Sequence, residues 1–407
     1  MSAATAPIGP FVGINNRLPD HQLGVVERGR KAGDYLRNAV NVDLTSAGTL
    51  QRRKGSTLVV PGADCHSLWS DGEQAFYVDG TDLKRFSGGV VATGLARGRP
   101  VSFCKAPTGD VIWTDGVRLE AIDKGAVAVP TPNPAPTVTA SGGGALHAGH
   151  YQVCITAVAA DGRESGSTWP VQVEVPDSGR IEVSGLPGTL VNIYVSPLNG
   201  DTLYLTASTT ASSYIIPVMG VQGAQCPALN LRPLPAGRFV REYHGRLLVA
   251  DATGLYYSEP WAYGLYNPLR SYIPLPGITL LEPGQTGVYV ATADKTYWLS
   301  GLDVDQVERM VEQLPYGAVE GSATRIENSN DIAWFSARGL VVGSQDGQAK
   351  NMQEENVVVG MAQVGATLYR EQDGMRQLVA AVSGAQESRA AANSFMTMEV
   401  VRKENML

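Results

Sequence analysis

The chain has 407 residues and a net charge of −7; 43% of its residues are hydrophobic and only 17% are charged. This composition excludes a chain that is disordered over most of its length, and the negative charge excludes a globally basic nucleic-acid-binding protein. The 46 glycines and 24 prolines, together with recurrent Val, Thr and Ser, favour many short strands joined by tight turns.

The first 60 residues carry a local excess of positive charge. They contain eight Lys or Arg side chains and four acidic ones, so this segment has a charge of +4 and the remainder of the chain has −11. Such a segment can bind an acidic neighbour or the acidic body of a second copy. Contact with DNA phosphates and an ordinary solvated surface are the alternatives. The candidate residues for an inter-subunit or neighbour contact are Arg28, Arg30, Lys31, Arg52, Arg53 and Lys54.

Hairpin patterns recur along the chain. Each consists of a strand rich in aromatic or branched residues, a turn and a second strand, and Asp-Gly turns supply the positive φ that tight hairpins require. The turns are expected at Gly48, Asp79-Gly80, Asp115-Gly116, Gly254, Asp294, Arg338-Gly339 and Asp373-Gly374. Successive turns are 32 to 45 residues apart, apart from one interval of 138 residues. If residues 134–234 are an insertion, that interval shortens to 37 residues and the series becomes regular.

A hairpin repeat of this length is typical of a β-propeller, whose four-stranded blades stack to bury their apolar faces. The sequence therefore predicts an all-β protein, with a β-propeller of about six blades over residues 36–133 and 235–384. The hairpin at Gly48 would be its first. Five or seven blades, an ordinary β-sandwich and an array of hairpins are the alternatives. Residues 1–35 are expected to form an N-terminal arm, and residues 385–407 to close the propeller or contact a neighbour.

Residues 134–234 are predicted to form a domain of their own between two proline-rich stretches. Tyr151, Val153, Ile155 and Ala157 alternate with Gln152, Cys154 and Thr156, which predicts a half-buried strand. The stretches "AGHYQVCITAVAADGRESG" and "VNIYVSPLNGDTLYL" resemble strands of a fibronectin type III module, although Pro197 departs from the family pattern. The resemblance implies an inserted seven-stranded sandwich and no particular chemistry.

Residues with the spacing of known catalytic or metal sites are not found in the sequence. No G-x-S-x-G or G-x-x-x-x-G-K-[ST] motif occurs, and His147 and His150 lack nearby Cys or carboxylate partners. Three carboxylate pairs fall in turns or charge runs, which favours a solvated surface over a glycosidase pair: Asp71 with Glu73, Asp303 with Asp305, and Glu354 with Glu355. We expect no enzymatic activity and no catalytic, metal-binding or cofactor-binding residues.

Aromatic residues cluster in the stretch "GLYYSEPWAYGLYNPLRSYIP". A sugar-stacking platform is one interpretation. Packing between blades or at a subunit contact, where Tyr and Trp are favoured, is the preferred one. The candidate aromatic contact surface consists of Tyr256, Tyr257, Trp261, Tyr263 and Tyr266.

Cysteine usage and the N-terminal residues bear on the cellular compartment. Cys65, Cys104, Cys154 and Cys226 form no C-x-x-C pair and are predicted to be free buried thiols, as in a protein assembled in a reducing cytoplasm. The N-terminus lacks the charged and apolar regions of a signal peptide. No apolar run approaches the ~20 residues of a membrane span, so we expect neither secretion nor a membrane span.

Two N-terminal segments, "FVGINNRLPDHQL" and "YLRNAVNVDLTSAGTLQRRKGSTLV", resemble the opening of tailed-bacteriophage virion proteins. These are the propeller-bearing nozzle, or packaged-DNA-stabilisation, proteins of short-tailed phages. A later stretch, "LLVADATGLYYSEPWAYGLYNP", fits the same family. The pattern "A-x-N-V-D-[LI]-x-x-x-G-x-[LV]-x-R-R-x-G" and its flanks are matched by Asn38, Asn41, Asp43, Gly48, Arg52, Arg53 and Gly55.

The resemblance implies a structural component of a phage tail, located in the virion after assembly in the host cytoplasm. It would be a nozzle-like or tail-hub ring protein, with a hexamer favoured, that helps to form or close the DNA exit channel and anchors other phage tail proteins. Transient contact with genomic DNA in the channel is implied as well. The fibronectin-like insertion departs from the simplest such proteins. It leaves open whether the chain belongs to the nozzle, the baseplate or a decorating part of the tail. A receptor- or glycan-binding tail module and a propeller glycosidase are the alternative functions.

Overall fold

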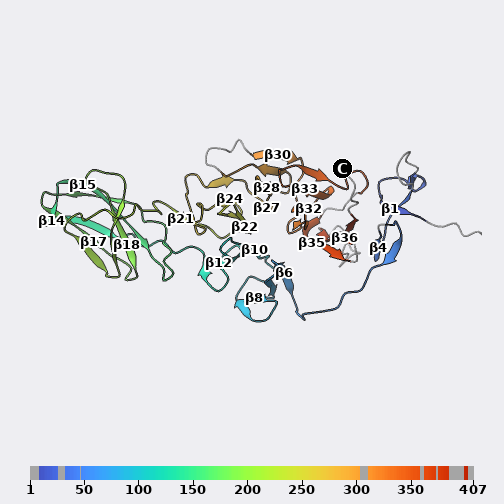
Figure 1. Cartoon of the computed structure of the whole chain (residues 1–407), viewed down its shortest axis with the longest axis horizontal. Helices are drawn as coiled ribbons and strands as arrows, with labels where there is room; N and C mark the ends of the chain where they lie inside the picture. The colour runs from blue at the N-terminus through green and yellow to red at the C-terminus, as the bar shows by residue number, and fades with distance from the viewer. Residues whose placement is uncertain are drawn as a thin grey trace, which may run out of the picture. The chain divides into compact units, whose positions relative to one another are not determined.

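The computed structural model describes residues 9–25, 33–45, 47–302, 310–357, 362–372, 375–384 and 398–401. Regular structure in these residues is β-strand, apart from one 3₁₀ turn at Asp20–Gln22 (Figure 1). The chain divides into two compact units, one of residues 63–275 and one of residues 1–62 with 276–407. Among the described residues, no helix has the length and apolarity that a membrane crossing requires.

In the unit of residues 63–275, three four-stranded antiparallel sheets have their strands side by side in chain order. In every one of them the two central strands are a predicted hairpin, around Gly80, Gly116 or Asp251–Gly254. The strands are β6 (Cys65–Ser70), β7 (Ala75–Asp79), β8 (Asp82–Arg85) and β9 (Val90–Ala92); β10 (Ser102–Lys105), β11 (Val111–Thr114), β12 (Leu119–Ala121) and β13 (Gly125–Ala126); and β22 (Phe239–Tyr243), β23 (Arg246–Ala250), β24 (Gly254–Tyr257) and β26 (Tyr272–Pro274).

The middle one of these three sheets is buried on both faces. All four residues of β11 are buried. Val111 and Trp113 belong to the core shared with the β6–β9 sheet, whereas Ile112 belongs to the core shared with the β22–β26 sheet. Because successive side chains of a strand point to opposite faces, an unbroken apolar run is what a strand between two layers requires.

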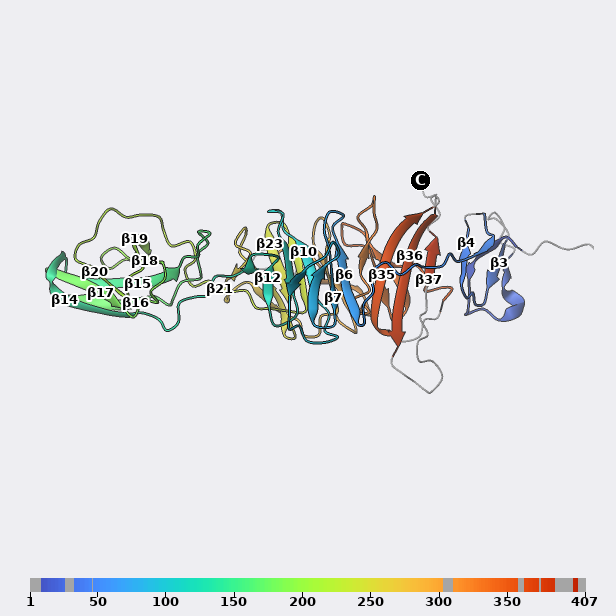
Figure 2. The same cartoon turned by 90° about the horizontal axis from the view of Figure 1, so that it is seen from below.

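A two-layered sandwich occupies residues 137–216 of the same unit, inside the predicted insertion (Figure 2). It has seven strands, and its core comes from the facing sides of both sheets. One sheet contains β14 (Thr137–Leu146), β17 (Gly179–Ser184) and β20 (Ser213–Ile216); the other contains β16 (Val171–Val175), β15 (Gly149–Ala157), β18 (Val191–Val195) and β19 (Tyr204–Thr209). A short sheet of β21 (Arg232–Pro233) and β25 (Leu265–Tyr266) follows.

The prediction that β15 is half-buried is wrong. Cys154 and Thr156, on the face expected to meet solvent, have no exposed surface. Cys154 packs with Tyr194, Leu203 and Cys226 in a second, smaller core. The segment after β20 covers Cys154, and the hydroxyl of Thr156 donates to Glu164 in the loop after β15. Alternation along one strand reveals neither contact.

Three further sheets lie in the unit of residues 1–62 and 276–407. Their central hairpins again include predicted ones, around Asp294 and Arg338-Gly339; the predicted turn at Asp373-Gly374 lies outside the described residues, between paired strands. The strands are β27 (Leu280–Pro283), β28 (Val288–Ala291), β29 (Thr296–Leu299) and β30 (Met310–Leu314); β31 (Thr324–Arg325), β32 (Ile332–Ser336), β33 (Gly339–Gly343) and β34 (Ala349–Asn351); and β35 (Ala362–Gln372), β36 (Met375–Gly384) and β37 (Met398–Val401).

The sheet with β32 also lies between two layers. Ile332 and Trp334 pack with Tyr289 and Trp298 of the preceding sheet, while Phe335 packs toward β35 and β36. The centroids of the Tyr289 and Trp334 rings lie 5.2 Å apart, within the range of favourable aromatic pairs. In both units, therefore, one sheet packs against neighbouring sheets on both of its faces.

The N-terminal residues form two small sheets in this second unit. Strands β1 (Phe11–Ile14), β3 (Gly33–Leu36) and β2 (Gly24–Val25) make one, and β4 (Val42–Leu44) and β5 (Leu50–Arg52) make the predicted hairpin at Gly48. The expectation that this hairpin starts the series of four-stranded sheets is wrong, because β4 and β5 pair only with each other. Charged and polar side chains dominate β5, all of whose residues are exposed, so it lacks the apolar faces of a stacked sheet.

Replacing Trp334 by Ala should destabilise the unit of residues 1–62 and 276–407. The indole is fully buried in the core between two sheets, so its removal should lower the free energy of unfolding by about 3–5 kcal/mol. Urea denaturation followed by circular dichroism measures this loss. Trp169→Ala is the control, since that side chain is 59% exposed and should lose less than ~1 kcal/mol. Equal losses in both variants would contradict the packing described.

Candidate functional site

The predicted basic cluster is only partly described. Arg53 closes the β4–β5 hairpin: its Nε lies 3.1 Å from Oδ1 of Asp43, and its backbone N–H donates to the carbonyl of Asn41. Arg52 and Lys54 are exposed on either side of it. The structure therefore assigns a hairpin-stabilising role to one cation of this group and leaves two on the surface. The remaining candidates, Arg28, Arg30 and Lys31, lie outside the described residues.

The "GINN" segment before this hairpin is a docking point for the N-terminal residues. Asn15 is 2% exposed; its Oδ1 accepts the backbone N–H groups of Arg17 and Leu18, and its Nδ2 donates to Oδ1 of Asn356 at 3.2 Å. Asn16 donates its backbone N–H to the carbonyl of Asn356. The segment thereby satisfies its buried amide and fastens the N-terminus to the loop after β34.

Gly48 requires its residue type for two reasons. Its φ of +80° is one that other residues rarely adopt. A Cβ there would also lie 2.6 Å from Cβ of Pro10. The backbone N–H of Phe11 donates to the Gly48 carbonyl at 2.7 Å, so the glycine allows the hairpin turn to pack against β1.

Four of the five predicted aromatic contact residues are packed inside the unit of residues 63–275. Tyr257 is 4% exposed and donates its hydroxyl to the carbonyl of Arg270. Tyr256, Tyr263 and Tyr266 lie against the core between the β10–β13 and β22–β26 sheets. These tyrosines therefore pack within the unit, between two of its sheets.

Trp261 is the exception, with 70% of its surface exposed. Its φ is +60°, and its backbone N–H donates to the carbonyl of Gly245 at 2.7 Å. The indole lies over the β22–β23 turn, so close that a Cβ on Gly245 would be 3.0 Å from its Cε2. Beside it, the exposed His244 stacks on Tyr243 at 4.1 Å. Sequence reasoning missed His244, because nothing in its immediate neighbours distinguishes it.

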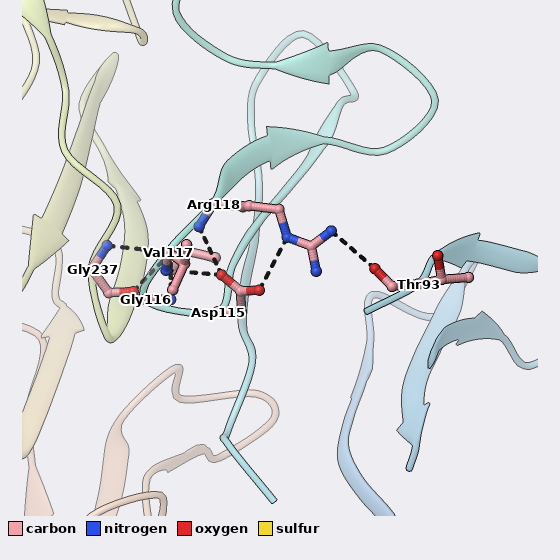
Figure 3. A network of polar contacts seen from close by, with 7 residues as sticks. Thr93, Asp115, Gly116, Val117, Arg118 and Gly237 are labelled. Carbon is pink, nitrogen blue, oxygen red and sulfur yellow. Dashed lines mark hydrogen bonds and ion pairs between the residues drawn. The ribbon is translucent and has the colours of Figure 1, made fainter. Parts of the chain in front are cut away.

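A buried polar network surrounds the predicted turn at Asp115-Gly116 (Figure 3). Oδ1 of Asp115 accepts the backbone N–H groups of Val117 and Arg118, and its Oδ2 lies 3.1 Å from Nε of Arg118. The guanidinium reaches on to the carbonyl of Thr93 at 3.2 Å and lies 5.0 Å above the ring of Trp113. The adjacent Thr114 donates its hydroxyl to the carbonyl of Gly237 at 2.7 Å. The network thus ties one hairpin turn to segments from two neighbouring sheets.

Two carboxylates in such turns have a strongly stabilised charge. Burial opposes ionisation of Asp115, but the N–H groups of Arg118 and Val117 and the guanidinium outweigh it, so its pKa lies below the ordinary 3.8. The ammonium of Lys105, 2.8 Å from Asp71, and the N–H of Gln74 lower the pKa of Asp71 to about 2. In both carboxylates Oδ1 accepts backbone N–H groups of its own turn and Oδ2 faces a cation, so these perturbed acids have a structural role.

In the described part of the chain, the cysteine and histidine side chains do not cluster in the way that metal ligands do. Among the described residues, no group of three or more His, Cys, Asp or Glu side chains could hold a metal ion. His147 and His150 are exposed. All four cysteines are free, and three are buried as expected. Burial raises the pKa of Cys104 to about 12. Cys65 is exposed, contrary to the prediction, because it begins the edge strand β6.

Comparison with known proteins leaves the family of the chain open. No protein-family model and no curated protein matches it. Among solved structures, the extracellular domain of a hybrid two-component system from B. thetaiotaomicron is similar, with 10% sequence identity and a TM-score of 0.30. The match covers 78% of this chain and 37% of that one, so the chain spans little more than a third of that protein's length. At this TM-score the likeness says nothing about function.

The Asp115 network should make the stability of the unit of residues 63–275 depend on pH. Because the pKa of Asp115 is lowered on folding, its contribution is complete above pH ~4 and is lost as the pH falls through the folded-state pKa. Asp115→Asn should therefore cost about 1–3 kcal/mol at pH 7, and the difference from wild type should shrink below pH 4. Urea denaturation at pH 7, 4 and 3 tests this expectation.

Asp123→Asn is the matched control for this experiment. Asp123 is 70% exposed and pairs with Arg85, so its loss should cost less than ~1 kcal/mol. A difference between wild type and the Asp115 variant that stays constant from pH 7 to pH 3 would refute the role given to the carboxylate.

Proposed function

We propose that the chain is a structural protein of a bacteriophage tail, a nozzle-like or tail-hub ring component. The observation that carries this proposal is the position of the N-terminal segment that resembles such proteins. Its pattern residues Asp43, Gly48 and Arg53 make the contacts that hold the β4–β5 hairpin. The "GINN" residues dock the same segment on Asn356. The matching residues thus specify an anchored hairpin rather than a reaction centre.

The stacked sheets support the finer proposal of a β-propeller with about six blades. Five sheets have four strands in chain order and one has three, and in each unit successive sheets pack face to face. Each sheet contains one of the predicted hairpins, which is the repeat expected of blades. The sandwich of residues 137–216 is proposed to be the fibronectin type III-like insertion, on the strength of its seven strands in two layers.

Charge supports a ring of identical subunits with other tail proteins as partners. Arg52 and Lys54 are exposed beside the hairpin, in a segment of charge +4 on a chain whose remainder carries −11. A closed ring uses one heterologous contact repeatedly, so a basic edge can meet the acidic body of the next subunit. A hexamer around a DNA channel in the virion is the arrangement we favour.

The first test is electron microscopy of the purified chain, with its solution mass at low and moderate salt. A ring with an open axial channel is the expected result. Arg52→Glu with Lys54→Glu should reduce the ring fraction about tenfold at low salt, because a rim charge then repels its partner. Arg99→Glu with Lys350→Glu changes the net charge equally at other exposed sites and should leave the ring intact. A monomer under all conditions, also when neighbouring tail proteins are added, would refute the proposal.

Trp261 favours a second candidate function, a receptor- or glycan-binding tail module. A largely exposed indole in the left-handed backbone region is a costly arrangement of the kind that binding sites retain. If this function holds, a host surface polysaccharide binds the chain at millimolar or better affinity, and Trp261→Ala weakens binding at least tenfold. Calorimetric titration measures both, with Trp169→Ala as the exposed-tryptophan control. Unchanged binding in the Trp261 variant would exclude this surface.

A further inference from the structure

Cys154 and Cys226 lie together in the smaller core on the outer face of β15, within the unit of residues 63–275. Tyr194 and Leu203 complete this core. Cys154 has no exposed surface, and Cys226 is 6% exposed. A hydrogen bond joins the two thiols, although they belong to segments far apart in the sequence. The fold therefore places two reduced sulfur atoms in direct contact.

Backbone hydrogen bonds hold the segment that carries Cys226 in this position. The N–H of Cys226 donates to the carbonyl of Leu203 at 2.9 Å. Two residues further on, the carbonyl of Ala228 accepts the N–H of Ser167 at 2.9 Å. A disulfide forms only between cysteines whose backbones already lie close together. Because the reduced chain already fixes Cys226 beside Cys154, this pair meets that requirement.

The environment gives the two thiols different reactivity. The hydrogen bond from Cys154 stabilises the thiolate of Cys226, so the pKa of Cys226 lies below its ordinary value although burial opposes the shift. The same hydrogen bond, together with burial, raises the pKa of Cys154. The carboxylate of Glu164 opposes ionisation of both thiols. The thiolate is the reactive form of cysteine, so Cys226, which is also the more exposed of the two, should react first.

We propose that Cys154 and Cys226 are a redox-active pair that hydrogen peroxide converts to a disulfide, and that this disulfide restrains the segment after β20. The Cys226 thiolate attacks one peroxide oxygen and becomes a sulfenic acid. The O–O bond breaks, and the other oxygen leaves as hydroxide, which takes up the proton lost by Cys226 to form water. The Cys154 sulfur then attacks the Cys226 sulfur. The S–O bond breaks, and the oxygen leaves as a second water with the proton of Cys154.

The two thiols together lose two electrons, and one peroxide molecule is reduced to two waters. The new bond would tie β15 to the segment after β20 and close a long loop of the chain, which restricts opening of the sandwich. A reducing compartment keeps such a pair as thiols, in agreement with the free cysteines of this structure. The proposal is independent of the tail function, since it rests on one pair within one unit.

Mass spectrometry of the oxidised wild-type chain is the first test. The full chain is treated with hydrogen peroxide, its remaining thiols are alkylated in denaturant, and it is digested without reduction. The expected product is a linked pair of peptides that contain Cys154 and Cys226, two hydrogen atoms lighter than the separate peptides and separated by dithiothreitol. Recovery of these cysteines unlinked, or of Cys154 linked mainly to the exposed Cys65, would overturn the proposal.

Serine variants test the order of the two steps. Cys154→Ser should trap Cys226 as a sulfenic acid, which dimedone labels, and Cys226→Ser should leave Cys154 as a thiol. Cys104→Ser is the matched control, because Cys104 is also buried but lies in a different core, and it should form the link as wild type does. Absence of dimedone label on Cys226 in the Cys154 variant would contradict the proposed order.

Hydrogen exchange of the wild-type chain tests the restraint without any variant. Oxidation should slow exchange of the Cys226 backbone amide about tenfold, because the link opposes local opening of this segment. Dithiothreitol should restore the original rate. An unchanged rate in a chain that carries the link would refute the restraint.

Discussion

The burial of apolar faces between stacked sheets is the constraint on which the rest of this structure depends. A four-stranded sheet of such short strands cannot cover its own faces, so it is stable only when neighbours cover them. Within each unit the middle sheet meets this requirement on both sides. Strands β11 and β32 are buried along their whole length, and alternate residues in each contribute to two different cores.

Turn chemistry then sets the register of these sheets. Asp71 and Asp115 each accept two backbone N–H groups of their own turn and hold a cation as well. The resulting charge is stabilised strongly enough to overcome burial, which would otherwise favour the neutral acid. Two carboxylates with a lowered pKa therefore stabilise hairpin turns. The side chain of Asn15 also stabilises the fold, because its hydrogen bond to Asn356 joins the N-terminal segment to the loop after β34.

The surfaces left over by this architecture are the places where binding can occur. The hairpin of β4 and β5 uses Arg53 internally and presents Arg52 to solvent. The β22–β26 sheet buries its tyrosines and presents Trp261. Between β33 and β36 the packing of two sheets leaves an apolar space beside Leu340 and Leu378. Most of the basic and aromatic side chains singled out in the sequence therefore stabilise the fold. Our functional proposals rest on those that remain exposed.

The sequence by itself determined the all-β class and the described hairpins. These depend on local signals, namely alternating apolar residues and the positive φ that Gly48, Gly80 and Gly116 allow, and the structure confirms them. Only the tertiary structure decided which faces are covered. The outer side of β15 is buried by a segment distant in sequence, and the first hairpin stands apart from the stacked sheets.

The candidate sites divide in the same way. Composition pointed to the basic and aromatic clusters, but it could not separate Trp261 from the tyrosines beside it, because exposure depends on how neighbouring sheets pack. The cavity beside Leu340 and Leu378 had no signal in the sequence, because its wall forms only where two sheets distant along the chain pack together.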